Sequence, residues 1–144
     1  MKKTKILFIN DDLDFSETNK IMLEQAGYEV IIEQSGKKGI DSVKRNTPDL
    51  IICDVMLPDI NGFSVCRGLK EDPNYSSIPI ILLGDIGASP DSYVENIAKS
   101  LKDIYLLYKW SRNIALFHSQ VLNCIHHIGK FHTLRTSFST GIAT

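Results

Sequence analysis

Short apolar runs alternate along the chain with longer segments in which apolar residues recur every three or four positions. The short runs are typical of strands buried on both faces, and the longer segments are typical of amphipathic helices. The apolar runs predict strands at residues 5–10, 28–33, 49–54, 78–83 and 103–109.

Helix signals separate these strands. Asp14 followed by Glu17 forms a capping-box pattern and predicts the start of a first helix, which Gly27 ends. Thr47-Pro48 ends the second, because the residue before a proline avoids the helical conformation. A helix is also predicted after each of the third, fourth and fifth strands. The five predicted helices cover residues 14–26, 35–46 and 62–72, a segment that begins at Ser89-Pro90, and residues 111–128.

Strand and helix alternate five times. Strands that are apolar on both faces and are joined by helix-length connections indicate a parallel sheet covered by helices on both sides, an α/β fold. The 144 residues fit one domain. We predict this domain over residues 1–129, and we expect residues 130–144, which lack a clear period, to be a frayed tail or the start of a linker.

Composition and charge narrow the classes of protein. The net charge of -1 gives no general attraction to nucleic acid, and we expect no nucleic-acid binding by this chain. No apolar segment is long enough to span a membrane, so we expect no membrane association and a cytoplasmic protein. The three cysteines lack metal-like or redox-like spacing and lie among apolar neighbours, which favours reduced, packed thiols; they are Cys53, Cys66 and Cys124.

Acidic residues collect where the predicted strands end. Asn10-Asp11-Asp12 closes the first strand, Asp54 the third, and Asp85 follows the fourth, while Lys109 closes the fifth. In a parallel sheet these ends meet at one edge. Converging carboxylates repel one another unless a cation intervenes, and Mg²⁺ prefers such oxygen ligands. A carboxylate between Mg²⁺ and a lysine is equipped to accept a phosphoryl group.

The sequence resembles the receiver domains of response regulators, the phospho-accepting proteins of two-component signalling. The matching segments are "ILFINDDLDF", "PDLIICDVMLPDINGF", "LKEDPNYSSIPIILL" and, less clearly, "YLLYKW", which together span about residues 5 to 128. The most specific is the buried strand that ends in Asp54, followed by Leu-Pro and then Gly62. The resemblance implies a doubly wound, flavodoxin-like (βα)5 fold with a five-stranded parallel sheet.

The resemblance also implies roles for individual residues. Asp54 would be the phosphoacceptor, and Asp11 would bind Mg²⁺ directly together with Asp54. Met56 would supply its backbone carbonyl to the metal, and Lys109 would pair with the phosphoryl group. Pro58 and Gly62 would shape the loop after the acceptor.

The family usually carries two acids at the end of its first strand. We favour Asn10–Asp11 as the corresponding pair, because Asp14 then falls where the family begins its first helix; Asp11–Asp12 is the alternative. Either Asn10 or Asp12 would therefore reach the metal through water. An asparagine in the first position removes one carboxylate, and we expect it to weaken Mg²⁺ binding without abolishing it.

Other departures lie where the family converts phosphorylation into a conformational change. Gly84 replaces a Ser or Thr hydroxyl at the end of the fourth strand. Trp110 replaces the proline that follows the lysine, and Leu106 occupies the position of an aromatic switch residue. The phosphoacceptor chemistry is thus expected to survive better than the usual switch.

We predict a signalling protein rather than an enzyme. Its partners would be a sensor histidine kinase or phosphotransfer protein and a downstream protein bound by the face of the fourth helix, fifth strand and fifth helix. The main alternative is a receiver-fold binding module that works without phosphorylation, which Asn10 and Gly84 favour. A phosphatase of the haloacid-dehalogenase type, with Asp12 and Asp14 as its aspartate pair, is a third and weaker hypothesis because this segment enters a capped helix.

Overall fold

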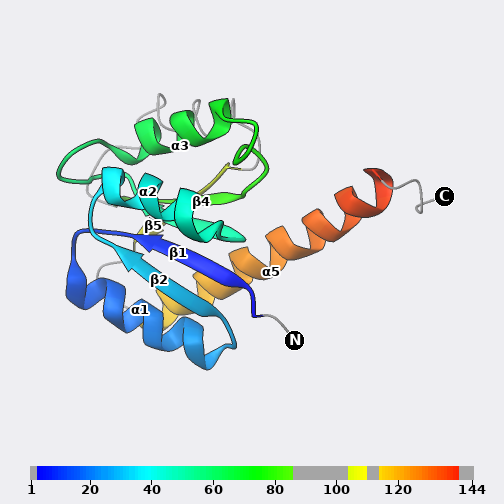
Figure 1. The fold of residues 1–144 in the computed structure, drawn as a ribbon. Helices are drawn as coiled ribbons and strands as arrows, with labels where there is room; N and C mark the ends of the chain where they lie inside the picture. Colours follow the sequence, from blue (N-terminus) through cyan, green and yellow to red (C-terminus); the bar gives the residue numbers. More distant parts are fainter. Residues whose placement is uncertain (1–2, 86–103, 110–113, 140–144) are drawn as a thin grey trace. The chain divides into compact units, whose positions relative to one another are not determined.

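The computed structural model describes residues 3–85, 104–109 and 114–139, with the backbone alone at residues 85, 108, 109, 114 and 130–139. The chain divides into two compact units, residues 1–111 and 112–144. The first contains a sheet with its helices and the second contains one long helix (Figure 1). The helix predicted from Ser89, and with it most of the expected fourth-helix face, lies outside the described residues.

The first unit is built on a five-stranded parallel sheet, as predicted. Its strand order is β2-β1-β3-β4-β5. All neighbouring strands pair in parallel, so every strand ends at the same edge. The strands are β1 (Lys5–Ile9), β2 (Glu29–Glu33), β3 (Leu50–Asp54), β4 (Ile80–Asp85) and β5 (Ile104–Lys109).

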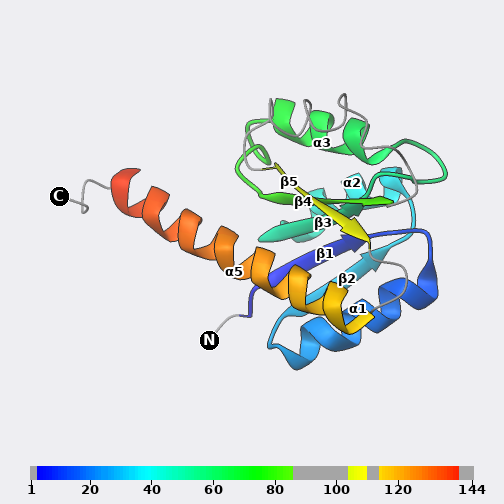
Figure 2. The same ribbon diagram turned by 180° about the vertical axis from the view of Figure 1, so that it is seen from behind.

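The central strands form the core because they are apolar on both faces. All five residues of β3 are buried, and so are the last four of β1. Such strands must be covered on both sides. Helix α1 (Leu13–Gln25) lies on one face of the sheet, and α2 (Gly36–Asn46) and α3 (Gly62–Glu71) lie side by side on the other (Figures 1 and 2).

Local sequence explains where α2 begins and ends. Ser35 is extended, and its side chain accepts a hydrogen bond from the backbone N–H of Lys38. Thr47 adopts a left-handed conformation with φ of 44° and closes the helix just before Pro48. Both boundaries match the prediction.

The predicted start of α1 is wrong by two residues. Asp12, not Asp14, caps the helix: its backbone is extended and its side chain accepts from the N–H of Phe15. The chain turns this early because the Asn10 side chain accepts from the N–H of Asp12 at 2.9 Å, which folds the backbone immediately after β1. Asp14 lies in the first helical turn instead.

The second unit contains α5 (Ile114–Ser139). Its buried apolar residues recur at helical spacing, as predicted; they are Phe117, Val121, Ile125 and Ile128. The helix continues past residue 128 and reaches Ser139. The domain boundary at 129 and the expected tail over residues 130–144 stay predictions. Among the described residues, no helix combines the length and the apolar character that crossing a bilayer requires.

Candidate functional site

The candidate site lies at the carboxyl edge of the sheet, where Asp54 ends β3. Its side chain is 3% exposed. Pairing continues past it, since the N–H of Val55 donates to the carbonyl oxygen of Leu83 at 3.0 Å. Strands β1 and β3 are neighbours in the sheet although α1, β2 and α2 separate them in the chain. This is the point where strand order reverses, the usual ligand position in such sheets.

Asn10 is the residue that β1 brings next to Asp54. Ile9 is in register with Cys53. Asn10 directly follows Ile9, and Asp54 directly follows Cys53, so Asn10 and Asp54 are neighbours across the two strands. Asn10 is fully buried, and its Oδ1 is engaged by the N–H of Asp12. Its Nδ2 has no hydrogen-bond partner among the described residues. A buried donor without a partner in the protein marks a place where water or a ligand is expected.

Asp11 and Asp12 differ in what their side chains do. Asp12 caps α1 through the N–H of Phe15 at 3.1 Å, so its carboxylate is engaged in holding the helix. Asp11 is exposed at the same edge of the sheet. The Asn10–Asp11 register and its alternative, Asp11–Asp12, stay predictions.

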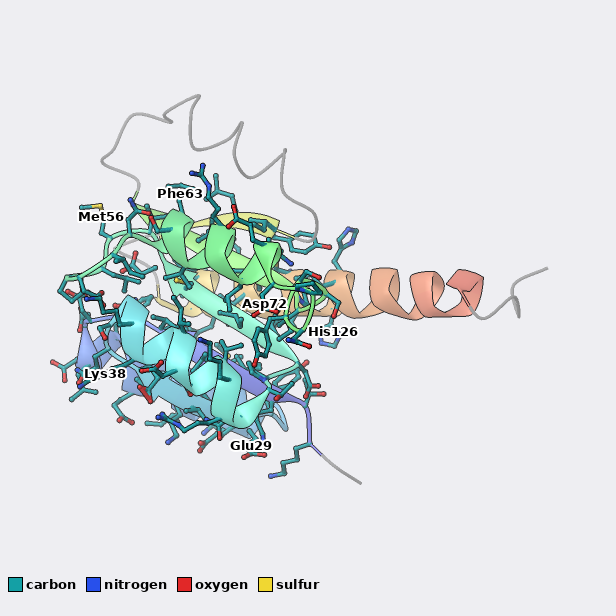
Figure 3. The ribbon with its side chains drawn as sticks, turned by 45° about the horizontal axis from the view of Figure 1, so that its top comes forward. Glu29, Lys38, Met56, Phe63, Asp72 and His126 are labelled. Carbon is teal, nitrogen blue, oxygen red and sulfur yellow. The ribbon has the colours of Figure 1, made fainter. Side chains whose placement is uncertain are left out.

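Met56 is the second residue of the loop after Asp54. Its N–H donates to Asp54 Oδ1 at 3.3 Å, and its side chain is 67% exposed. In Figure 3, Met56 and Lys38 lie toward one end of the unit that contains the sheet, and Glu29 and Asp72 lie toward its other end. Since Glu29 starts β2, Met56 is at the carboxyl end of the sheet.

The rest of this loop is closely held. The N–H of Gly62 donates to the carbonyl of Val55 at 2.9 Å, and a Cβ on Gly62 would overlap the carbonyl oxygen of Asp54. Asn61 caps α3 by accepting from the N–H of Ser64 at 2.9 Å. Gly62 is therefore needed for the close approach of α3 to Asp54.

Asp59 lies in the loop between β3 and α3 and connects this loop to the start of α2. Its carboxylate accepts from the N–H groups of Gly36 and Lys37, both at 2.8 Å. Backbone N–H groups, that of Lys37 first and then those of Ile60 and Gly36, hold the pKa of Asp59 down to about 2 against the opposing effect of desolvation. Only the fold reveals this contact, because the partners are 22 and 23 positions away.

The cysteines are packed thiols, as predicted. All three are free. Burial raises the pKa of Cys53 well above its usual value, with further contributions from Cys66 and then Asp54. Burial also raises the pKa of Cys66, to about 12. Neither thiol is suited to act as a nucleophile beside Asp54.

Strands β4 and β5 complete the edge of the sheet. Gly84 is buried and brings no hydroxyl. Leu106 is half-buried and packs against the core. Lys109 ends β5 in register with Asp85; only the backbone of both residues is described, and Trp110 lies outside the described residues.

The donors at this edge fit a magnesium ion. Mg²⁺ is usually held by one or two carboxylates, with water and phosphate oxygens completing its shell. Asp11 and Asp54 supply two carboxylates, and the Met56 carbonyl is a third oxygen on the loop. Within the described part of the chain, no group of three or more His, Cys, Asp or Glu side chains is placed to hold a metal.

Comparison with known proteins gives the family. The sequence model of the response regulator receiver domain matches residues 6–107. The chain is 39% identical over 90 residues to the response regulator ArlR of Staphylococcus saprophyticus, a match that covers 62% of this chain and 38% of ArlR. It is 40% identical over 87 residues to the DNA-binding dual master transcriptional regulator RpaA of Synechocystis, covering 60% of this chain and 36% of RpaA.

A solved structure shows the same fold. The Mn²⁺-bound form of response regulator Rcp1 superposes with a TM-score of 0.68 at 23% identity, over 82% of this chain and 88% of that one. The chain belongs to the response regulator receiver domain family. Its match spans little more than a third of the length of ArlR and RpaA.

Proposed function

We propose that Asp54 accepts a phosphoryl group from a phosphohistidine on a sensor histidine kinase or phosphotransfer protein. An oxygen of Asp54 attacks phosphorus, the phosphorus–nitrogen bond breaks, and the electron pair stays on the imidazole. The observation that carries this proposal is an aspartate, Asp54, that is only 3% exposed at the strand-order reversal. Burying a carboxylate is costly unless a charged partner or ligand meets it.

The neighbouring residues would divide the work. Asp11, Asp54 and the Met56 carbonyl would hold Mg²⁺, with Asn10 or Asp12 reaching it through water. The bound ion would neutralise the charge of the phosphoryl group. Lys109 would pair with a phosphoryl oxygen from the end of β5. The signal would then pass to a downstream protein.

The decisive experiment weighs the protein after incubation with acetyl phosphate and Mg²⁺. We expect the added mass of one phosphoryl group, mapped to the peptide that contains Asp54. Asp54→Asn should take up none, while Asp41→Asn, an exposed acid on α2, should behave like the wild type. No uptake by the folded wild type, or equal uptake by Asp54→Asn, would refute the proposal.

A receiver-fold binding module that works without phosphorylation is the second candidate. Two observations favour it: Asn10 puts a buried amide where the family has an acid, and Gly84 lacks the hydroxyl of the family. This candidate predicts no phosphoryl uptake and no chemical-shift change on adding Mg²⁺. Saturable Mg²⁺ shifts at Asp54 and Met56 would exclude it.

A further inference from the structure

The carboxylate of Asp59 joins two elements that are far apart in the chain. Asp59 lies in the loop between β3 and α3, whereas Gly36 and Lys37 form the start of α2. Each carboxylate oxygen accepts one backbone N–H, Oδ1 from Gly36 and Oδ2 from Lys37, both at 2.8 Å. Hydrogen bonds to an ionised acceptor are among the stronger ones.

Apolar packing reinforces the same contact. The side chain of Ile60 lies so close to Gly36 that a Cβ there would overlap it, and Val65 of α3 is the next neighbour. Ile60 is half-buried against the core of the sheet. The loop therefore meets the first turn of α2 through a charged contact and an apolar one at adjacent residues.

Helix capping alone does not account for Asp59. Helix α2 already has its own cap, because Ser35 Oγ accepts from the N–H of Lys38 at 3.2 Å. Lys37 is exposed, whereas Gly36 is buried, so Asp59 also satisfies a helix N–H that the Ser35 cap leaves over. The contact therefore acts on the helix and on the loop, and its effect on the loop bears on the site.

The loop is anchored to the acceptor on both sides of Asp59. Before it, the N–H of Met56 donates to Asp54 Oδ1. After it, Gly62 donates to the carbonyl of Val55 and lies against the backbone of Asp54. Only a short segment separates each anchor from Asp59, so a shift at Asp59 is transmitted to the Met56 peptide.

We propose that Asp59 is a positioning residue of the phosphoacceptor site: by tying the loop after β3 to the first turn of α2, it fixes the Met56 carbonyl and the Asp54 carboxylate relative to each other. The inference rests on the proposed function for its effect on Mg²⁺. The geometry that it invokes is measurable without phosphorylation.

The test compares Asp59→Ala and Asp59→Asn with Asp41→Asn, which removes an exposed acid from α2 that makes no hydrogen bond among those described. Amide hydrogen exchange at Gly36 and Lys37 reports the contact itself. Backbone NMR shifts of Met56 and Gly62 report the loop, and an Mg²⁺ titration reports the site. Asp59→Asn keeps one acceptor oxygen, so it serves if Asp59→Ala does not fold.

We expect Asp59→Ala to speed exchange at Gly36 and Lys37 and to shift the amide resonances of Met56 and Gly62. The Mg²⁺ dissociation constant should rise on the order of tenfold, the lower end of what losing a group behind a metal ligand costs. Asp59→Asn should lie between Asp59→Ala and the wild type, and Asp41→Asn should match the wild type.

Changes confined to the first turn of α2, with Met56 and Gly62 unmoved, would reduce Asp59 to a helix cap and overturn the proposal. Unchanged Mg²⁺ affinity in Asp59→Ala would overturn it as well. Failure of the proposed phosphoacceptor function would look different from failure of the Asp59 proposal. In that case the wild type would take up no phosphoryl group, and the loop resonances of the Asp59 variants would not affect this result.

Discussion

Asn10 and Asp54 lie side by side at the carboxyl edge of the sheet, one residue beyond the paired Ile9 and Cys53. Both are buried, with 0% and 3% of their surfaces exposed. The amide of Asn10 avoids the repulsion that a second buried carboxylate beside Asp54 would create. It also removes one negative charge from the side of the site where the metal would bind.

Asn10→Asp should therefore bind Mg²⁺ more tightly while lowering the stability of the metal-free protein. A unit charge near an ion is worth about 1–4 kcal/mol before desolvation offsets part of it, so the dissociation constant should fall on the order of tenfold. Thermal unfolding with EDTA should occur at a lower temperature than in the wild type. An Mg²⁺ titration and a thermal scan check both effects.

Asn74→Asp is the matched control, because Asn74 is exposed in the loop after α3 and the chemical change is the same. It should leave Mg²⁺ affinity and the metal-free melting temperature near their wild-type values. Unchanged Mg²⁺ affinity in Asn10→Asp would mean that residue 10 does not face the metal.

The parts of this structure that could be predicted from sequence depend on local chemistry. The strands follow from unbroken apolar runs, and the end of α2 follows from the backbone restriction before Pro48. That Asp54 ends a buried strand beside the end of β1 follows from the pattern of a parallel sheet.

Contacts between distant segments could not be predicted in this way. Asp59 meets Gly36 because the loop after β3 and the first turn of α2 converge in space, and no local pattern records that pairing. The start of α1 was misplaced for a related reason. Asp12 and Asp14 are both good capping residues, and the side chain of Asn10 decides between them by turning the chain early.

Gly62→Ala should destabilise the protein, because the added methyl group overlaps the backbone carbonyl of Asp54. Overpacking of this kind costs about 1–3 kcal/mol. Gly68→Ala is the control in the same helix: a Cβ there meets nothing within 4 Å. It should stabilise α3 by about 0.5–1 kcal/mol, since glycine is the more flexible in the unfolded chain. Urea unfolding of both variants measures the difference, and equal effects would contradict the close approach at Gly62.

The hydrogen bonds to Asp59 predict a pH dependence. Its pKa falls from 3.8 to about 2 in the folded protein, chiefly through the Lys37 N–H. A lowered pKa contributes stability above the unfolded value, and this contribution is lost as the pH falls through the folded value. The wild type should therefore melt above Asp59→Asn at neutral pH, and the gap should close between about pH 4 and pH 2. A gap that stays constant down to pH 2 would show that the charge of Asp59 does not contribute.

The buried thiols predict an order of chemical labelling. Alkylation requires the thiolate, and with a pKa of about 12 Cys66 is ionised to roughly one part in ten thousand at pH 8. Cys53 is fully buried as well and its pKa is raised further by its neighbours. Cys124 is only partly buried, although burial raises its pKa too. Iodoacetamide should thus modify Cys124 first in the native protein.

Peptide mass spectrometry follows the three sites separately. Unfolding in guanidinium should bring all of them to similar rates, since burial is then lost. Labelling of Cys53 in native buffer as fast as Cys124 would show that β3 opens to solvent. Because Asp54 is the next residue of that strand, such opening would also remove the burial on which the phosphoacceptor assignment depends.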